Sequence, residues 1–413
     1  MSKKIAIVGT LDTKGEQIKY LKDRIEGQGN EVIVMDAGVL GKALFEPDIT
    51  REQVARASGS SLEEISTLND EARAIGKMAI GASEIIRQLR STGNLDGLLG
   101  LGGTMGTSLA LTVMRAVPFH LPKLIVSTCA FAPFITPETV SGDLMMMEWP
   151  AGLWGLNSMS KWTLNMAAGA ISGAAETYRG TEVNGKKIVG ITTLGPSVCT
   201  YLNLLKTDLE KKGYEVAAFH TQGIGGRIFE QAIGEGLIGV ALDLGTCELV
   251  NQTAGGAYIA GEERLETAGK KGIPQIVAPG CLDIFGWLTG KPFPRRLRTR
   301  PKHEHNSLVT AVKSSKEEKT KAGKLIAEKL NKAKGPTAMV IPMRGFSAWD
   351  KPGGFSYDPE GREAFRKTLR KNLKPEIRVI ELDAHINDNT FSDEVMRLFD
   401  QMVGAPNLTD KRS

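Results

Sequence analysis

Two segments near the start of the chain combine glycine with threonine directly after short apolar runs. The first is Gly9-Thr10-Leu11-Asp12-Thr13-Lys14, and the second is Gly102-Gly103-Thr104-Met105-Gly106-Thr107. A loop between a strand and a helix offers unpaired backbone N–H groups and the positive end of the helix dipole, which suit a phosphate. Each segment therefore indicates an anion-binding loop. For the first, a plain turn capped by Thr or Asp is the alternative.

The side chains of the first loop add chemistry suited to a nucleotide. Gly9 lets a backbone approach a phosphate closely, Thr10 and Thr13 carry hydroxyl donors, and Lys14 supplies a point charge. Asp12 is a candidate ligand for Mg²⁺, directly or through water. The spacing matches neither the P-loop pattern G-x-x-x-x-G-K-[ST] nor the dinucleotide pattern G-x-G-x-x-G.

A third candidate element is Asp36-Ala37-Gly38, at the end of the next apolar run. An acidic residue in this place commonly binds a ribose hydroxyl in nucleotide-binding folds. Capping of the following turn by Asp36 is the competing explanation. We expect Asp36 and Gly38 to contribute to the nucleotide site.

The elements that position these loops alternate between strands and helices. In the first half, strands are expected at 5–8, 32–35, 98–101 and 124–126, and helices at 16–26, 70–89 and 107–116. Such alternation predicts an α/β fold with a parallel sheet. Right-handed crossovers place all strand carboxyl ends at one edge, where ligands bind near the switch in strand order.

The second half of the chain begins as the first did. A polar turn at Thr181–Lys187 marks the predicted boundary between an N-terminal domain, 1–184, and a C-terminal domain, 185–413. Further strands are expected at 188–191, 216–219, 238–242, 275–278, 338–341 and 378–381, with helices at 198–212, 262–271, 315–334, 362–372 and 392–403. The fold expected is two Rossmann-like subdomains, each a mostly parallel sheet flanked by helices, with a cleft between them.

The second domain has its own polar loops. His220–Arg227 follows a strand and opens a helix, which predicts another anion-binding loop. His303 and His305 alternate in a loop beside four arginines, where anion binding or simple exposure is favoured over a metal site. A glycine-containing loop, Arg344–Ser347, continues to Asp350. The candidate substrate-contacting or catalytic residues of this domain are Arg227, His305, Arg344 and Asp350.

Composition limits the class of protein. The net charge is +5 over 413 residues, which is too small to imply nucleic-acid binding, and the four cysteines match no zinc spacing. No apolar run approaches the 18 or more residues of a membrane helix, and no apolar N-terminal signal region is present. We therefore expect a cytoplasmic protein with reduced thiols and no membrane partner.

With these loops in view, the sequence resembles the Tm-one-like ATP-binding domain family, formerly an uncharacterised-protein family, which includes the N-terminal part of the tomato mosaic virus resistance protein. The resemblance spans nearly the whole chain in order and spacing. The segments that carry it are GTLDTK (9–14), DAG (36–38), GLGGTMGTS (100–108), HTQGIGGR (220–227), GGAYIAGEERLETAGKKGIPQIVAPGCLD (255–283), HNSLVT (305–310), GFSAWD (345–350) and DAHIND (383–388).

The resemblance implies two Rossmann-like subdomains, ATP bound by the first, and a homodimer. It carries ATP contacts onto Gly9, Thr10, Asp12, Thr13, Lys14, Gly102, Gly103, Thr104 and Thr107. The sequence departs from the family pattern at Gly245–Cys247 and at Val312–Ser315. Both departures lie in the second domain, so they put in doubt the transfer of a ligand there and leave the ATP loops untouched.

Three functions are compatible with these features. The first is an ATP- and Mg²⁺-dependent enzyme acting on a small acidic metabolite held between the domains by groups such as Arg227, His305 and Arg344. The second is a partner-binding module regulated by ATP without turnover, as suggested by the family's antiviral member. The third, an NAD-dependent oxidoreductase using Asp36, is disfavoured because the dinucleotide pattern is absent.

Overall fold

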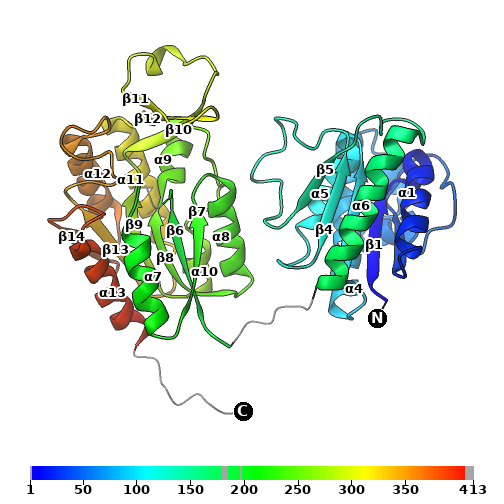
Figure 1. The fold of residues 1–413 in the computed structure, drawn as a ribbon, viewed down its shortest axis with the longest axis horizontal. Coiled ribbons are helices and arrows are strands. Elements are labelled where there is room, and N and C mark those ends of the chain that lie inside the picture. The colour runs from blue at the N-terminus through cyan, green and yellow to red at the C-terminus, as the bar shows by residue number, and fades with distance from the viewer. Residues whose placement is uncertain (1, 179–184, 196–197, 405–413) are drawn as a thin grey trace. The chain divides into compact units, whose positions relative to one another are not determined.

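The computed structural model describes residues 2–178, 185–195 and 198–404. The chain divides into two compact units, Met1–Glu182 and Val183–Ser413, called unit 1 and unit 2 below (Figure 1). The predicted boundary at 184/185 falls at the edge of residues 179–184, which lie outside the described residues. No helix in the described ranges is both long and apolar enough to cross a bilayer.

Unit 1 is a five-stranded sheet with helices on both faces. Its strands are all parallel and run in the order β2-β1-β3-β4-β5. They comprise β1 (Lys4–Gly9), β2 (Glu31–Asp36), β3 (Gly97–Gly102), β4 (Lys123–Ser127) and β5 (Met145–Glu148). The helices are α1 (Leu11–Glu26), α2 (Arg51–Ala57), α3 (Leu62–Ser66), α4 (Glu71–Ser91), α5 (Thr104–Met114) and α6 (Ser158–Thr177).

Alternate side chains of β1 point to opposite faces of the sheet and pack into two separate hydrophobic cores of unit 1. Ile5 and Ile7 pack on one face with α1 and α6, whereas Ala6 and Val8 pack on the other with α4 and α5. A strand buried on both faces reads as a continuous apolar run, which is why β1 was recognisable in the sequence.

Unit 2 is a six-stranded parallel sheet in the order β14-β13-β9-β8-β6-β7. Its strands are β6 (Ile188–Thr193), β7 (Glu215–His220), β8 (Ile238–Gly245), β9 (Gln275–Gly280), β13 (Thr337–Pro342) and β14 (Arg378–Leu382). The helices are α7 (Tyr201–Lys211), α8 (Ile224–Gly234), α9 (Cys247–Ala254), α10 (Thr267–Lys271), α11 (Lys316–Leu330), α12 (Pro359–Asn372) and α13 (Asn389–Val403).

An antiparallel sheet of three strands is inserted between β9 and β13. It has the order β10-β12-β11 and is formed by β10 (Ile284–Leu288), β11 (Lys302–Glu304) and β12 (Val309–Lys313), with a short 3₁₀ helix, η1 (Arg295–Leu297), between β10 and β11. It lies beyond the carboxyl ends of β6 and β7 (Figure 1). The sequence analysis did not predict this sheet.

The two units share one topology. In each, the first strand lies between the second and the third, giving β2-β1-β3-β4 in unit 1 and β7-β6-β8-β9 in unit 2. The order switches between β1 and β3, and between β6 and β8, and such a switch point is where doubly wound sheets bind ligands. The prediction of an α/β fold with two Rossmann-like, mostly parallel sheets flanked by helices is confirmed.

Candidate functional site

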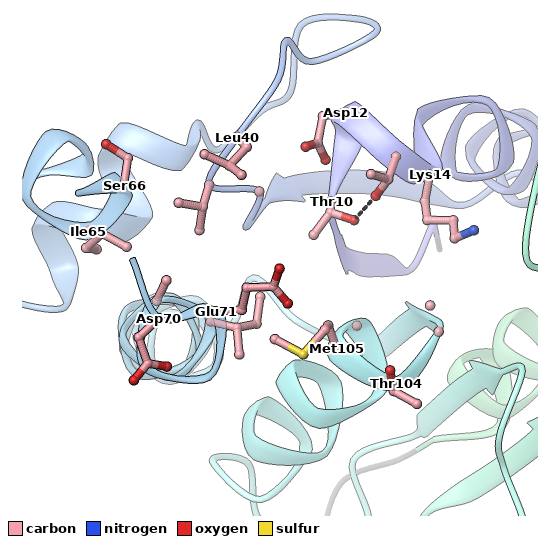
Figure 2. A pocket seen from close by; sticks show the side chains of 18 of the residues that line it. Thr10, Asp12, Lys14, Leu40, Ile65, Ser66, Asp70, Glu71, Thr104 and Met105 are labelled. Atoms are coloured by element: carbon pink, nitrogen blue, oxygen red, sulfur yellow. Dashed lines mark hydrogen bonds between the residues drawn. The ribbon is translucent and has the colours of Figure 1, made fainter. Parts of the chain in front are cut away.

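A pocket of about 680 Å³ opens at the switch point of unit 1. It lies beyond the carboxyl ends of β1 and β3, between the helices that follow them. Figure 2 shows Thr10 and Asp12 on one side of the pocket and Thr104 and Met105 on the other. Its lining consists of Thr10, Asp12, Thr13, Lys14, Gly38, Val39, Leu40, Ile65, Ser66, Asn69, Asp70, Glu71, Ala74, Ile75, Gly102, Gly103, Thr104, Met105, Gly106 and Leu153.

Two helix N-termini face this pocket, and neither is capped by the side chain of its own N-cap residue, although the first N–H of α1, that of Leu11, donates to Asp36. Helix α1 begins after Thr10 and α5 begins after Gly103, and neither of these residues makes a capping hydrogen bond. A Cβ on Gly102 would lie 2.7 Å from Cα of Gly106, so only glycine allows α5 to start this close to its strand. The first N–H groups of a helix need partners, and a ligand anion can provide them.

The hydroxyls of the first loop lie together at the pocket wall. Oγ1 of Thr10 and Oγ1 of Thr13 are 2.6 Å apart (Figure 2). Thr13 is exposed and Thr10 is half-buried, so both are accessible from the pocket. Thr104, at the start of α5, adds a third hydroxyl to the pocket wall and is exposed.

Asp12 has an incompletely satisfied carboxylate. Its Oδ1 is buried and has no hydrogen-bond partner among the described residues. Burial raises the pKa of Asp12, and the nearby charge of Asp36 acts in the same direction. A carboxylate oxygen without a partner, at the rim of a pocket suited to phosphates, fits the oxygen ligand that Mg²⁺ requires.

Lys14 does not direct its charge into the pocket as the sequence analysis expected. It is only 7% exposed, and its Nζ donates to the carbonyl oxygens of Gly152 at 3.1 Å and Leu153 at 2.5 Å. The ammonium also lies 5.5 Å from the Trp149 ring centroid. Burial lowers its pKa. Lys14 therefore links α1 to residues 152–153 through hydrogen bonds. It also forms part of the pocket wall.

Three predicted contact residues lie outside the pocket lining. Asp36 Oδ1 accepts hydrogen bonds from the backbone N–H groups of Leu11 at 3.0 Å and Gly38 at 2.9 Å, which is the turn-capping arrangement that competed with ribose binding. Thr107 is buried, with Oγ1 2.7 Å from Oγ of Ser127. Gly9 lies under α1, where a Cβ would come within 2.7 Å of Ile18 Cδ1.

Sequence reasoning missed the part of the pocket formed by α3, α4 and the loop after Gly38. Apolar side chains line this part, and two exposed carboxylates stand at the first turn of α4. The residues concerned are Val39, Leu40, Ile65, Ala74 and Ile75, with Asp70 and Glu71. The helix at 70–89 was predicted, but nothing in its pattern indicates that its N-terminus faces β1 and β3.

In unit 2 the predicted anion-binding loop is already occupied by a side chain of the protein. Oε1 of Glu248 accepts from the backbone N–H groups of Gly223 at 2.6 Å and Gly226 at 3.2 Å, at the start of α8. A Cβ on Gly226 would lie 1.9 Å from Glu248 Oε2, so the glycine accommodates this carboxylate. The expectation of an open anion site here was therefore wrong.

Glu248 belongs to a buried ionic cluster. Arg264, 1% exposed, donates from Nε to Glu248 at 2.5 Å and from Nη2 to Asp243 at 2.7 Å, and it also lies 3.4 Å from Glu230. The guanidinium of Arg264 thus forms ion pairs with three carboxylates. Burial raises the pKa of Glu248 to about 7, with Arg264 opposing the shift.

The four candidate residues of unit 2 are not gathered in one place. Arg344 is exposed and pairs with Asp383 through two hydrogen bonds of 2.8 and 2.7 Å. Asp350 is buried against Arg362 and accepts from the Phe346 N–H at 3.0 Å; burial, with Asp283, raises its pKa to about 6.

Arg227 is half-buried in the first turn of α8. His305 lines a separate, smaller pocket, and the other three candidates do not. Within the described ranges, no group of three or more His, Cys, Asp or Glu side chains is arranged to hold a metal ion.

Comparison with known proteins places this architecture in a family. The N-terminal domain model of the uncharacterised protein family UPF0261 matches residues 3–180, and the C-terminal domain model of the same family matches residues 186–403. The chain belongs to the UPF0261 family. The resemblance stated from the sequence is confirmed, since the family's relatives include the tomato protein Tm-1.

Relatives align over nearly the full length of this chain. A UPF0261 protein of Clostridium tetani is 39% identical over 95% of this chain and 97% of its own length. One from Brucella melitensis is 36% identical over 97% of this chain and 96% of its own length. The ToMV resistance protein Tm-1 of Solanum lycopersicum is 30% identical over 96% of this chain, which covers 55% of that longer protein.

Among solved structures, a UDP-N-acetylglucosamine 2-epimerase aligns with 98% of this chain and 99% of its own at 11% identity, with a TM-score of 0.25. A similarity at this level says nothing about function.

Proposed function

We propose that unit 1 binds ATP together with Mg²⁺ in the switch-point pocket. The observation that carries the proposal is the convergence of two helix N-termini, those of α1 and α5, on a pocket of about 680 Å³, with neither terminus capped by the side chain of its own N-cap residue. Each terminus carries the equivalent of roughly half a positive charge and several N–H donors. The apolar wall provided by α3, α4 and the loop after Gly38 suits the adenine ring.

The charges around the pocket support a metal-bound nucleotide over a free one. Its lining includes three carboxylates, Asp12, Asp70 and Glu71, and one ammonium, Lys14. Lys14 donates to two backbone carbonyls, so little of its charge is directed at a phosphate. A polyphosphate would meet net negative charge, and a divalent cation between the phosphates and the Asp12 carboxylate removes that repulsion.

We propose further that the nucleotide is used by an enzyme acting on a small acidic metabolite. None of the described residues lining the pocket is a histidine or cysteine, so this chain would contribute positioning and charge neutralisation rather than a nucleophile. When bound, Mg²⁺ would supply neutralisation of the developing phosphate charge. Release of phosphate or diphosphate across a panel of small carboxylic acids tests for turnover.

The competing proposal is regulation without turnover, in which ATP stabilises one state of the protein for a partner. The name of the tomato relative, a virus resistance protein, suits such a role. Absence of nucleotide consumption with every acid, together with retained binding, would favour this function.

A melting experiment tests the nucleotide itself. ATP with Mg²⁺ at 100 times its Kd should stabilise unit 1 by about 2.7 kcal/mol, a rise of several degrees in its melting temperature. NAD should give no comparable rise, because the pocket lacks the dinucleotide glycine pattern and Asp36 is engaged with Leu11 and Gly38. A larger shift with NAD than with ATP would contradict the assignment.

We also propose that the protein forms a homodimer through α6. Met159, Trp162 and Met166 are 49%, 64% and 58% exposed at helical spacing on this helix. Gly169 and Gly173 continue the helix with open space where a Cβ would be. A large exposed apolar face on a soluble chain marks an interaction surface, and a two-fold dimer is the commonest assembly.

A further inference from the structure

We propose that unit 2 contains a second ligand site, for a small carboxylic acid with a flat apolar body, which functions independently of nucleotide binding. The site is a pocket of about 210 Å³, room for about seven water molecules. That size suits a ring bearing one acid group. Its lining is Leu194, Gly195, Val198, His220, Gln222, Tyr258, Ile284, His305, Val309, Ala311 and Trp349.

The pocket lies where this topology binds ligands. The loops after β6 and β7, the first and second strands of the sheet, supply Gly195 and Gln222, as the loops after β1 and β2 do for the pocket of unit 1. Strands β10 and β12 supply Ile284, Val309 and Ala311, so the inserted antiparallel sheet forms its opposite wall. The insertion thus encloses the carboxyl edge of the sheet beside the switch point.

One wall is the indole of Trp349, and buried hydrogen bonds hold the chain on either side of this residue. On the residues before Trp349, Ser347 Oγ donates to Asp283 at 2.7 Å and the Ala348 N–H donates to the Val198 carbonyl at 2.9 Å. The next residue, Asp350, pairs with Arg362. Because the chain on both sides of Trp349 is fixed, the ring forms a preorganised surface for a flat ligand, which reduces the entropy lost on binding.

A second wall is the ring of Tyr258. It lies against Gly286, where a Cβ would be 2.5 Å from its Cζ, and its backbone N–H donates to Asn251 Oδ1 at 3.2 Å. Among the described residues its hydroxyl has no hydrogen-bond partner. Burial raises the pKa of Tyr258, which keeps the hydroxyl protonated as a donor.

The polar side chains of the pocket are those of His220, Gln222, Tyr258 and His305, and they include several hydrogen-bond donors. His220 Nε2 lies 3.1 Å from the carbonyl oxygen of Leu194, which can only accept, so Nε2 carries a hydrogen and Nδ1 is left for a ligand. The Gln222 side chain has no partner within the described ranges, and the His305 ring faces Trp349 with centroids 6.3 Å apart. No acidic side chain is among the lining residues. A carboxylate can accept from the Tyr258 phenol, the Gln222 amide and a ring N–H of His305, whereas Nδ1 of His220 is then an acceptor and cannot donate to it.

A phosphate is a poorer match than a carboxylate. The N-terminus of α8, which follows the loop of Gln222, is occupied by Glu248, and Arg264 is engaged by three buried carboxylates. A dianion would therefore enter without the α8 terminus or the Arg264 guanidinium to balance its charge. A singly charged carboxylate needs only neutral donors.

The test uses the full-length protein labelled with 5-fluorotryptophan and observed by ¹⁹F NMR. The Trp349 resonance is assigned by Trp349→Phe. Titration with benzoate and with cyclohexanecarboxylate should shift this resonance saturably, with or without saturating Mg²⁺ and ATP. Benzyl alcohol, of similar size and without the charge, should bind at least tenfold more weakly. No shift with either acid up to millimolar concentration, or equal affinity for the alcohol, overturns the proposal.

Variants locate the binding site. His305→Ala and Gln222→Ala should each weaken benzoate binding about tenfold or more, and both residues are exposed, so the fold should survive. His303→Ala is the matched control. Its exposed ring lies 5.4 Å from Trp349 yet outside the pocket lining, so affinity should stay within twofold. Equal losses in His303→Ala and His305→Ala would overturn the site. A failure of ATP binding would leave these results unchanged.

Discussion

Gly103 offers a direct way to close the proposed phosphate site. The residue is the N-cap of α5, with φ −78° and ψ −157°, and the nearest atom to a Cβ placed there is Thr128 Oγ1 at 3.8 Å. Any L-residue fits this conformation and this space. Aspartate is a preferred N-cap, because its carboxylate accepts from the N–H groups of the first helical turn. Gly103→Asp should therefore place a carboxylate where the phosphate is proposed to bind.

The expected loss of affinity follows from two effects. The ligand loses the N–H donors of α5, and a hydrogen bond to a charged group is worth about 1.5–3 kcal/mol. The new carboxylate also repels the phosphate, by up to about 4 kcal/mol at 4 Å for partly screened charges. A combined loss of roughly 3 kcal/mol or more corresponds to at least about 100-fold weaker binding of Mg²⁺ and ATP.

Calorimetry of Gly103→Asp and Gly103→Ala decides the matter. The alanine variant adds only a methyl group in open space, so its affinity should stay within about threefold of the wild type. The aspartate variant should melt at or above the wild-type temperature without ligand, since a capped helix is more stable. Retained ATP affinity in Gly103→Asp, with a normal fold, would refute the phosphate site at α5.

Four further outcomes follow from contacts described above. Asp12→Asn should raise the stability of the ligand-free protein at pH 7, because burial penalises the ionised carboxylate. It should also abolish the effect of Mg²⁺ on ATP affinity in calorimetry, whereas Asp70→Asn should keep that effect. Lys14→Met should lower the melting temperature of unit 1 by about 4–12 °C through loss of two hydrogen bonds, and Lys19→Met, exposed on the same helix, should not. Trp162→Glu should yield a monomer of 44.5 kDa by light scattering, and a wild-type mass of 44.5 kDa at micromolar concentration would contradict the dimer. The raised pKa of Glu248 means that the folded state binds its proton more tightly, so the stability of unit 2 should fall as pH rises from 4.5 to about 7; denaturant titrations should show a weaker fall in Glu248→Gln.

The sheets could be predicted because their strands are buried on both faces and therefore appear as apolar runs. The runs at 5–8, 98–101 and 238–242 all became central parallel strands. The edge strand β5 was missed, since its three methionines are only half-buried and do not favour a strand over a loop. The insertion of β10 to β12 was also missed, because its short strands carry no distinctive alternation.

The pocket lining was predicted only where it is continuous with the strand-to-helix loops. The roles of individual side chains could not be predicted, because they depend on contacts with residues far away in the sequence. Lys14 meets carbonyls 138 and 139 positions away, and Glu248 reaches Gly223 from 25 positions away. A lysine in a glycine- and threonine-containing loop looks like a phosphate ligand until its neighbours are known.

The carboxylate of Glu248 at the start of α8 marks a difference between two units that share one topology. A doubly wound sheet followed by a glycine-containing helix start can receive a phosphate, and the chain contains this arrangement twice. In unit 2 the protein supplies the anion at the start of α8 from its own sequence, as a tethered group that a free anion would have to displace. Because α8 follows β7, the second strand of its sheet, the counterparts of α1 and α5 are α7 and α9, so Glu248 closes this one helix start and leaves the other two as separate positions.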